Sequence, residues 1–215
     1  MTRVSRDIPD TPPRRRTVED PIAQYRLGRR HEEDGEESLA INWYRLSANQ
    51  GYAEAQHSLA QVLADFALFL PVGEKLDREL EEINFYNSAA IKQHYLPAIF
   101  ALAESYRKGN WYKRTIDTSL AIDYHRRAAE AGYPFSYYAL GIIFLERDGS
   151  QGDADFAVSS LIKAANYGIY EAQKKLANVF AGGHPRIPQN VSMAREWLRL
   201  AEENKNSPLR AEYCG

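Results

Sequence analysis

Small and apolar residues recur in two alternating patterns along this sequence, beginning at about residue 21. In the first pattern a small residue is followed four positions later by leucine and then by another small residue. Residues four apart lie on one face of an α-helix, so each copy predicts a helix with one buried face. The five copies carry Leu27, Leu59, Leu102, Leu140 and Leu176, which are 32, 43, 38 and 36 residues apart.

The second pattern lies between copies of the first and centres on an aromatic residue. A small or apolar residue is followed three positions later by the aromatic residue and four positions after that by another small residue, which again predicts a buried helical stripe. The clear copies are Ala40, Trp43 and Ser47, then Ala121, Tyr124 and Ala128, then Ala194, Trp197 and Ala201; the degenerate copies are Glu82, Phe85 and Ala89, and Ala157, Ser160 and Ala164. We expect Trp43, Phe85, Tyr124 and Trp197 to fill the volume between hairpins.

Glycine follows three of the second helices, four positions after the last small residue. Gly51, Gly132 and Gly168 are therefore predicted C-caps in the left-handed conformation. Gln93 and Lys205 occupy the position that we assign as equivalent in the other two copies. Those two helix ends are expected to be looser or capped differently.

The alternation of the two patterns predicts about five helix-turn-helix repeats. A single hairpin cannot bury its apolar face, whereas stacked hairpins form a continuous core, so the predicted fold is all-α, a right-handed α-α superhelix or solenoid. We place this solenoid at residues 21–203. Residues 1–20 are predicted to be a disordered N-terminal tail, and residues 204–215 a C-terminal tail.

The second repeat is interrupted between Asp65 and Leu80 by the apolar run Phe66–Leu70, which precedes Pro71. Helical spacing continues through this run, which predicts that the first helix extends about two turns further and that the following helix is also longer. The run then either packs inside an extended hairpin or forms an exposed apolar patch that meets a partner.

Composition and charge exclude several classes of protein. The 27 Lys and Arg and 29 Asp and Glu give a net charge of −2, which is not typical of a nucleic-acid-binding protein, and we interpret the run Arg14–Arg16 as solvated tail. No stretch is apolar and long enough for a transmembrane helix or a secretory signal. The single cysteine, Cys214, cannot form an intrachain disulfide, so we expect a cytoplasmic protein, with export by a non-classical route as the alternative.

Candidate chemistry is sparse, and we expect a protein that is not an enzyme and has no cofactor, metal or catalytic residue. The five histidines lie in different repeats without the spacing of metal ligands: His31, His57, His94, His125 and His184. His184 lies in a loop rich in glycine and proline, but without a neighbouring acid or nucleophile. Asn190-Val191-Ser192 fits a glycosylation acceptor, but Asn190 is better placed as the N-cap of the last helix.

These repeats resemble the Sel-one-like repeat family, a branch of the tetratricopeptide-like helical solenoids. The best copy runs from Trp43-Tyr44 through Ser47-Ala48-Asn49-Gln50-Gly51-Tyr52-Ala53-Glu54-Ala55-Gln56 to Leu59-Ala60. Similar runs are Ala128–Tyr133, Ala164–Gly168 and the loop Gly182–Asn190, so the resemblance covers about residues 21–203. It implies a scaffold or adaptor that binds protein partners, often in bacterial signalling, envelope biogenesis or host interaction.

The surface that would bind a partner follows from solenoid geometry, because the first helices of successive hairpins line the concave side. Side chains two positions before and two after each repeated leucine should face this groove. We predict that Tyr25, Arg29, His57, Gln61, Phe100, Glu104, Tyr138, Ile142, Lys174 and Asn178 form it. The alternative for Phe100 and Tyr138 is that they pack between neighbouring repeats.

The leading hypothesis is therefore a protein-protein interaction scaffold that binds a peptide or partner protein on the concave face. A second hypothesis is a secreted or regulatory effector that modulates a partner enzyme. A remote third, suggested by activities attributed to some relatives, is a hydrolase of cell-wall-like or β-lactam substrates. A nucleophile and a base that converge on the groove would favour the third hypothesis.

Overall fold

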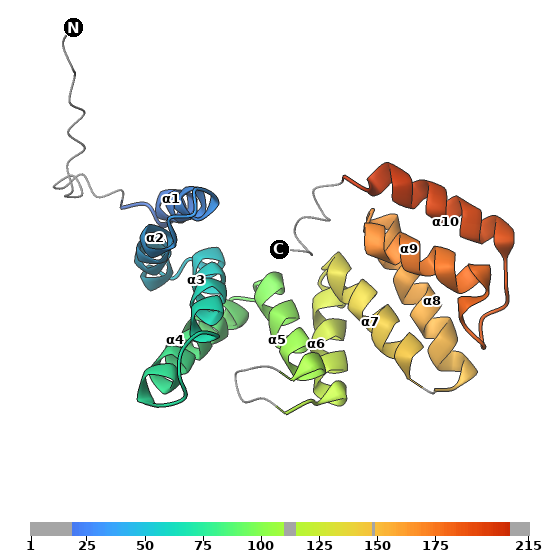
Figure 1. Cartoon of the computed structure of the whole chain (residues 1–215), viewed down its shortest axis with the longest axis horizontal. Helices are drawn as coiled ribbons and strands as arrows, with labels where there is room; N and C mark the ends of the chain where they lie inside the picture. The colour runs from blue at the N-terminus through green and yellow to red at the C-terminus, as the bar shows by residue number, and fades with distance from the viewer. Residues whose placement is uncertain (1–18, 110–114, 148, 207–215) are drawn as a thin grey trace, which may run out of the picture. The chain divides into compact units, whose positions relative to one another are not determined.

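The computed structural model describes residues 19–109, 115–147 and 149–206, and in these ranges it contains ten α-helices and no strand (Figure 1). The helices are α1 (Pro21–Glu33), α2 (Glu37–Asn49), α3 (Ala53–Ala67), α4 (Glu74–Lys92), α5 (Leu96–Lys108), α6 (Thr118–Glu130), α7 (Pro134–Glu146), α8 (Gln151–Asn166), α9 (Tyr170–Asn178) and α10 (Val191–Asn204). A short π-helical segment, η1 (Val179–Gly183), follows α9 directly. The expectations for residues 1–18 and 207–215 lie outside the described residues.

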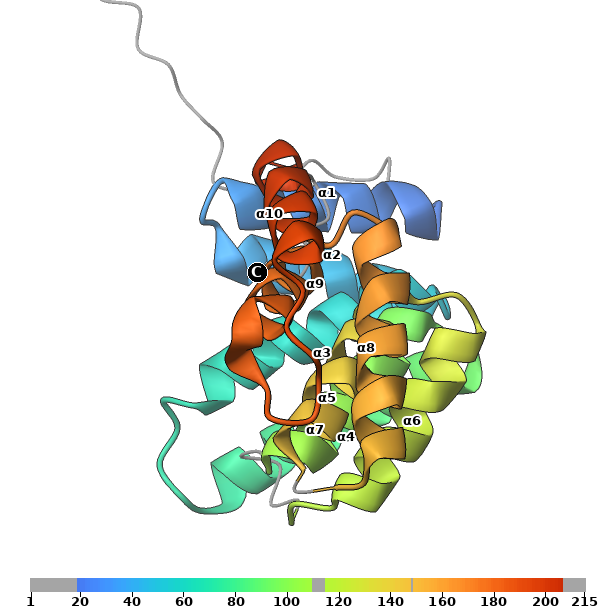
Figure 2. The same cartoon turned by 90° about the vertical axis from the view of Figure 1, so that its right-hand side faces the viewer.

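The helices pack as five consecutive pairs, since each odd-numbered helix makes its most extensive contacts with the helix that follows it. This confirms the predicted fold class, an all-α chain of five helix-turn-helix repeats. The chain divides into two compact units: unit 1 ends at Gln93 and holds α1–α4, and unit 2 begins at His94 and holds α5–α10. Within unit 2, α8, α9 and α10 lie side by side (Figures 1 and 2).

The core of unit 1 buries Ala40 and Ser47 as predicted, but it corrects the position of the buried aromatic residue in α2 and α4 by one. Tyr44 is completely buried and Trp43 only half-buried. In α4, Phe85 is 67% exposed whereas Tyr86 is 6% exposed, so the prediction that Phe85 fills the core is wrong. Spacings of three and of four both fit a helix of 3.6 residues per turn, and the pattern alone did not choose between them.

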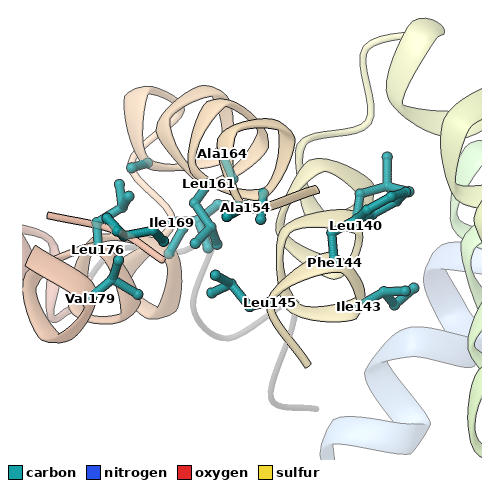
Figure 3. Packing of buried hydrophobic residues seen from close by; sticks show 14 of the residues in the cluster. Leu140, Ile143, Phe144, Leu145, Ala154, Leu161, Ala164, Ile169, Leu176 and Val179 are labelled. Atoms are coloured by element: carbon teal, nitrogen blue, oxygen red, sulfur yellow. The ribbon is translucent and has the colours of Figure 1, made fainter. Parts of the chain in front are cut away.

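Unit 2 has a continuous apolar cluster formed by α7, α8, α9 and neighbouring segments. Figure 3 shows Leu161 of α8 facing Ile169 and Leu176 across the space between α8 and α9. His125 is completely buried in α6, one position after the half-buried Tyr124. Trp197 of α10 is also half-buried and packs against the cluster, so the predicted contact of this ring with the core is confirmed.

The helix ends follow the sequence closely, with one correction. Gly51, Gly132 and Gly168 have φ angles of 89°, 92° and 85°, which confirms their left-handed caps. In the second repeat this position is taken by His94, with φ 58°, and not by Gln93, which is the C-cap of α4. The side chain of Asn190 accepts a hydrogen bond from the Met193 amide at 3.0 Å, which confirms it as the N-cap of α10.

The second repeat differs in part from the extended hairpin that the sequence predicts. As predicted, α4 is long, with 19 residues against 13 in α2. In contrast, α3 ends at Ala67, so its predicted continuation towards Pro71 is wrong. Beyond that point Leu68, Phe69 and Val72 are exposed and Leu70 is half-buried, which favours the exposed patch over internal packing.

Close helix contact in unit 2 gives a first prediction: Gly141→Ala lowers stability. Alanine is about 1 kcal/mol better than glycine inside a helix, which alone would stabilise the protein. However, a Cβ at residue 141 would lie 2.6 Å from Leu161 Cγ and 3.2 Å from the Ala157 carbonyl oxygen. We expect the overpacking to dominate and the free energy of unfolding to fall by about 1–3 kcal/mol, measured by urea denaturation.

The matched control is Gly152→Ala in the first turn of α8. There the nearest atom to an added Cβ is Ser150 Oγ at 3.5 Å, which is an ordinary contact. Stability should stay unchanged or rise by up to about 1 kcal/mol. An equal gain in both variants would show that α7 and α8 do not approach each other at Gly141.

Candidate functional site

The ten predicted partner-binding residues divide between unit 1 and unit 2, and each set is described by itself. In unit 1, Tyr25 is half-buried, with its ring centroid 5.7 Å from that of Tyr44 and 5.4 Å from that of Tyr52. Arg29, one turn further along α1, is exposed and its guanidinium lies 3.4 Å from a carboxylate oxygen of Glu33. Tyr25 thus has a packing role, whereas Arg29 remains accessible.

The α3 pair of predicted residues also has two different environments. His57 is buried, and its Nδ1 lies 3.3 Å from Oδ1 of Asn87 in α4. Burial lowers the pKa of His57 below the ordinary value for histidine, against the opposing effect of Asn87. Gln61 is exposed. His57 therefore offers little surface to a partner, and Gln61 offers more.

In unit 2, Phe100 of α5 lies within an aromatic cluster. Its ring centroid is 5.3 Å from that of His125, 5.4 Å from that of Tyr133 and 6.4 Å from that of Phe135. The side chain is half-buried and packs against the apolar core. These contacts favour the alternative that Phe100 joins neighbouring helices, with only part of its ring left for a partner.

Glu104, one turn after Phe100, is the centre of an ion-pair cluster. Its carboxylate lies 2.8 Å from a guanidinium nitrogen of Arg107, 2.9 Å from Nζ of Lys108 and 3.2 Å from Nε2 of His125. Burial alone would raise the pKa of Glu104, but the surrounding donors hold it well below its usual range. Glu104 therefore links α5 to α6 as an ionised carboxylate.

His125 is a structural residue that the sequence patterns did not single out. Its Nδ1 lies 3.5 Å from Oγ of Ser136, and its Nε2 faces Glu104. This order of hydroxyl, imidazole and carboxylate is also found in hydrolases, where the hydroxyl must reach the substrate. Ser136 and His125 are both completely buried, so we interpret the arrangement as a polar link between helices.

The remaining predicted residues lie on α7 and α9 of unit 2. Tyr138 and Ile142 are four positions apart on α7 and are half-buried; Lys174 and Asn178 are four positions apart on α9 and are exposed. Lys174 Nζ lies 5.2 Å from the ring centroid of Tyr170. Because a spacing of four keeps both members on one helix face, each pair presents a compact surface.

A cavity of about 540 Å³ lies elsewhere in unit 2, and none of the predicted residues contributes to it. It opens between α8 and the segment that joins α9 to α10, and its walls are mostly apolar. Its lining is Asp155, Val158, Ser159, Ile162, Lys163, Phe180, Arg186, Ile187 and Pro188. Sequence patterns point only to the connecting loop, because the lining residues of α8 lie outside its repeated positions Ala157, Ser160 and Ala164.

Among the described residues, no three or more histidine, cysteine, aspartate or glutamate side chains are grouped as they would be to hold a metal ion. No helix within the same ranges has the length and apolar character required to cross a membrane.

Comparison with known families identifies the repeats. The Sel1 repeat model matches residues 21–52, 96–133 and 171–206. These ranges contain α1 and α2, then α5 and α6, then α9 and α10, so each match covers one helix pair. The chain therefore belongs to the Sel1 repeat family, whose members are helical-repeat proteins that generally mediate protein-protein interaction as non-catalytic scaffolds.

Related sequences and structures agree with this assignment. The chain is 27% identical to chitin synthase regulatory factor 3 of Schizosaccharomyces pombe over 74% of its length, and 34% identical to the putative Sel1-like repeat-containing protein L21 of Acanthamoeba polyphaga mimivirus over 59%. It spans only 17% and 22% of those two proteins.

Two solved structures share the fold over 87% of this chain. The first is c5321, a protective antigen of uropathogenic Escherichia coli with an SLR fold (TM-score 0.70, 26% identity, 39% of that chain covered). The second is a Sel1 repeat protein from Oxalobacter formigenes (TM-score 0.69, 24% identity, 72% covered).

Proposed function

We propose that this chain is a scaffold that binds a peptide segment of a partner protein on the first-helix surface of unit 2, defined as Tyr138, Ile142, Lys174 and Asn178. These residues occupy equivalent positions in two consecutive repeats, 36 residues apart. The observation that carries the proposal is that all four keep accessible surface. Tyr138 packs against the apolar cluster with part of its ring, as Phe100 does, whereas Glu104, at the position of α5 equivalent to Ile142 and Asn178, is held in an ion-pair cluster with His125 of α6.

The chemistry of this surface suits a peptide with both an apolar and a polar anchor. Tyrosine is enriched at binding hot spots because its ring buries a large area at a small entropic cost. Beside it, Lys174 supplies a positive charge and Asn178 supplies an amide that both donates and accepts hydrogen bonds. In unit 1, the accessible Arg29 and Gln61 are the corresponding candidates, and Tyr25 and His57 contribute less exposed area.

The test begins with affinity purification of the full chain and identification of its partner by mass spectrometry, followed by calorimetric titration with that purified partner. We expect Tyr138→Ala and the double variant Lys174→Ala, Asn178→Ala each to weaken binding about fivefold to thirtyfold, since truncated contact residues cost about 1–2 kcal/mol. The double variant should keep the wild-type melting temperature, whereas Tyr138→Ala also loses packing against the apolar cluster and should stay folded with a lower melting temperature. Lys175→Ala is the matched control, because Lys175 lies on another face of α9.

If the wild type and all three folded variants bind the partner with equal affinity, the first-helix surface does not bind the partner and the proposal is wrong. A loss of affinity in Lys175→Ala as large as in the double variant would indicate a general charge effect. Neither result is expected from the geometry of α9.

A regulatory role is the second candidate, in which the bound partner is an enzyme whose activity changes. The observation that favours it is the regulatory name of the Schizosaccharomyces pombe relative. Measuring the activity of the identified partner with and without the chain separates the two roles. We also propose a reducing compartment such as the cytoplasm, because the sequence contains one cysteine and therefore no intrachain disulfide.

A further inference from the structure

Residues 66–72 of unit 1 comprise the end of α3 and most of the turn that leads to α4, and are called here the apolar turn because several of their apolar side chains are exposed. Phe69 is 86% exposed and Val72 is 90% exposed, and Phe66 and Leu68 are also exposed. Soluble proteins expose single apolar residues routinely, but contiguous exposed groups mark interaction sites.

The apolar turn is an insertion relative to the other repeats. The repeated leucines Leu59 and Leu102 are 43 residues apart, against 32 to 38 elsewhere in the chain. The core of unit 1 includes Leu59 and Ile83 and reaches Ala67 at the end of α3, whereas the side chains of Leu68, Phe69 and Val72 lie outside it. The exposed side chains are therefore an addition to the repeat.

The backbone of the apolar turn is held in a defined conformation. Three successive hydrogen bonds join the amides of Leu68, Phe69 and Leu70 to the carbonyl oxygens three residues earlier, at 3.2–3.3 Å. Pro71 fixes one further backbone angle directly after them. An ordered turn presents Phe69 to a partner at a lower entropic cost than a flexible loop would.

Carboxylates surround the apolar turn in the sequence and in the fold. Residues 65–82 contain six Asp and Glu and two Lys and Arg, a net charge of −4. Arg45 of α2 pairs with Glu82 at 2.8 Å, so the net charge is −3 when this arginine is counted. The first turn of α4 carries Glu74 and Asp77. Burial raises the pKa of Asp65, and the nearby Glu37 of α2 adds to this effect, which shows that carboxylates from two helices lie close together here.

This charge decides between the possible occupants. An anionic membrane surface would repel a segment of net charge −4, and a second copy of the chain would bring two such segments together. A partner protein with an apolar pocket and a basic rim would instead gain attraction from the same carboxylates.

We propose that the apolar turn is a second interaction surface, in which Phe69 and Val72 enter an apolar pocket of a partner protein whose rim carries lysine or arginine. This surface lies in unit 1 and does not include the first-helix surface of unit 2. The two proposals can therefore fail separately.

In the experiment, the photoreactive residue p-benzoylphenylalanine replaces Phe69 of the full chain. The variant is expressed in the cells that normally produce this protein, and the cross-linked protein is identified by mass spectrometry. The purified partner is then titrated with the wild type and with the double variant Phe69→Ser, Val72→Ser at low and high salt. We expect one discrete heteromeric cross-link, at least tenfold weaker binding by the double variant, and weaker wild-type binding as salt rises.

Phe85→Ser is the matched control, since Phe85 is also exposed in unit 1 but lies eleven residues, about 16 Å, beyond the start of α4. It should bind within twofold of the wild type, and both variants should keep the wild-type melting temperature. Tyr138→Ala should leave this binding unchanged.

Four results would overturn the proposal. In the cross-linking experiment these are no cross-link at position 69, or cross-links only to another copy of the chain. The third is that the chain sediments with vesicles of phosphatidylcholine and phosphatidylglycerol and that Phe69→Ser abolishes this sedimentation. The fourth is that the folded double variant binds the partner with unchanged affinity.

Discussion

Replacing Tyr44 with alanine is expected to lower the free energy of unfolding of unit 1 by about 3–5 kcal/mol, the usual cost of truncating a fully buried aromatic side chain. Tyr44 has no exposed surface, and its hydroxyl donates a 2.5 Å hydrogen bond to Glu32 of α1. Its ring also fills the space beside Gly28, where an added Cβ would lie 2.5 Å from the ring. Truncation therefore leaves a cavity between α1 and α2 and removes the partner of a carboxylate. Urea denaturation followed by circular dichroism measures the change.

Trp43→Ala is the matched control for this prediction, because Trp43 is the adjacent and larger aromatic residue but is only half-buried. We expect a smaller loss for Trp43→Ala than for Tyr44→Ala. A larger loss for Trp43→Ala than for Tyr44→Ala would show that Trp43 is the core residue, as the sequence pattern predicts. It would contradict the packing of α2 in the structure.

Glu104→Gln is expected to destabilise unit 2 by up to about 3 kcal/mol near pH 7, because removing one partner of a buried ion pair leaves its other members uncompensated. The pKa of Glu104 is lowered in the folded state, so its contribution is complete above the ordinary glutamate pKa of 4.5 and is lost as the pH falls towards the folded value. The stability difference between wild type and variant should therefore narrow below about pH 4.5. Urea denaturation at pH values between about 7 and 3 measures this difference in the free energy of unfolding.

Glu130→Gln serves as the control, since Glu130 is exposed at the end of α6 in the same unit. It should change stability by less than about 0.5 kcal/mol at any of these pH values. A Glu104→Gln difference that stays constant down to pH 3 would contradict the ionised cluster around this carboxylate.

Much of the fold could be predicted from the sequence, because small residues and leucines at helical spacing mark the helix pairs and glycines mark their ends. Besides the predicted continuation of α3 towards Pro71, the error lay in the second helices, where adjacent aromatic residues compete for one buried position. Trp43 and Tyr44, or Phe85 and Tyr86, both fit a period of 3.6, and only the packing of the partner helix selects the second of each pair. The left-handed residue that ends α4 is likewise displaced by one position, from the predicted Gln93 to His94.

The candidate site was less predictable, because its contacts join helices that are distant in the sequence. Glu104 pairs with His125, which lies 21 residues later in the sequence. Because of this contact the Glu104 carboxylate offers little surface to a partner. The cavity beside α8 combines one helix with a loop more than twenty residues further on. Side-chain offsets within one helix indicate a face, but they do not show which members of that face neighbouring helices cover.

Hydroxyl-radical footprinting with the purified partner tests the proposed first-helix surface most directly, because it reports the solvent access of individual side chains. Tyr138 of α7 belongs to this surface, whereas Tyr167, at the C-cap of α8, is exposed and does not. The proposal predicts that saturating partner reduces the labelling rate of Tyr138 severalfold and leaves that of Tyr167 unchanged. Unchanged labelling of Tyr138 at saturation would contradict it.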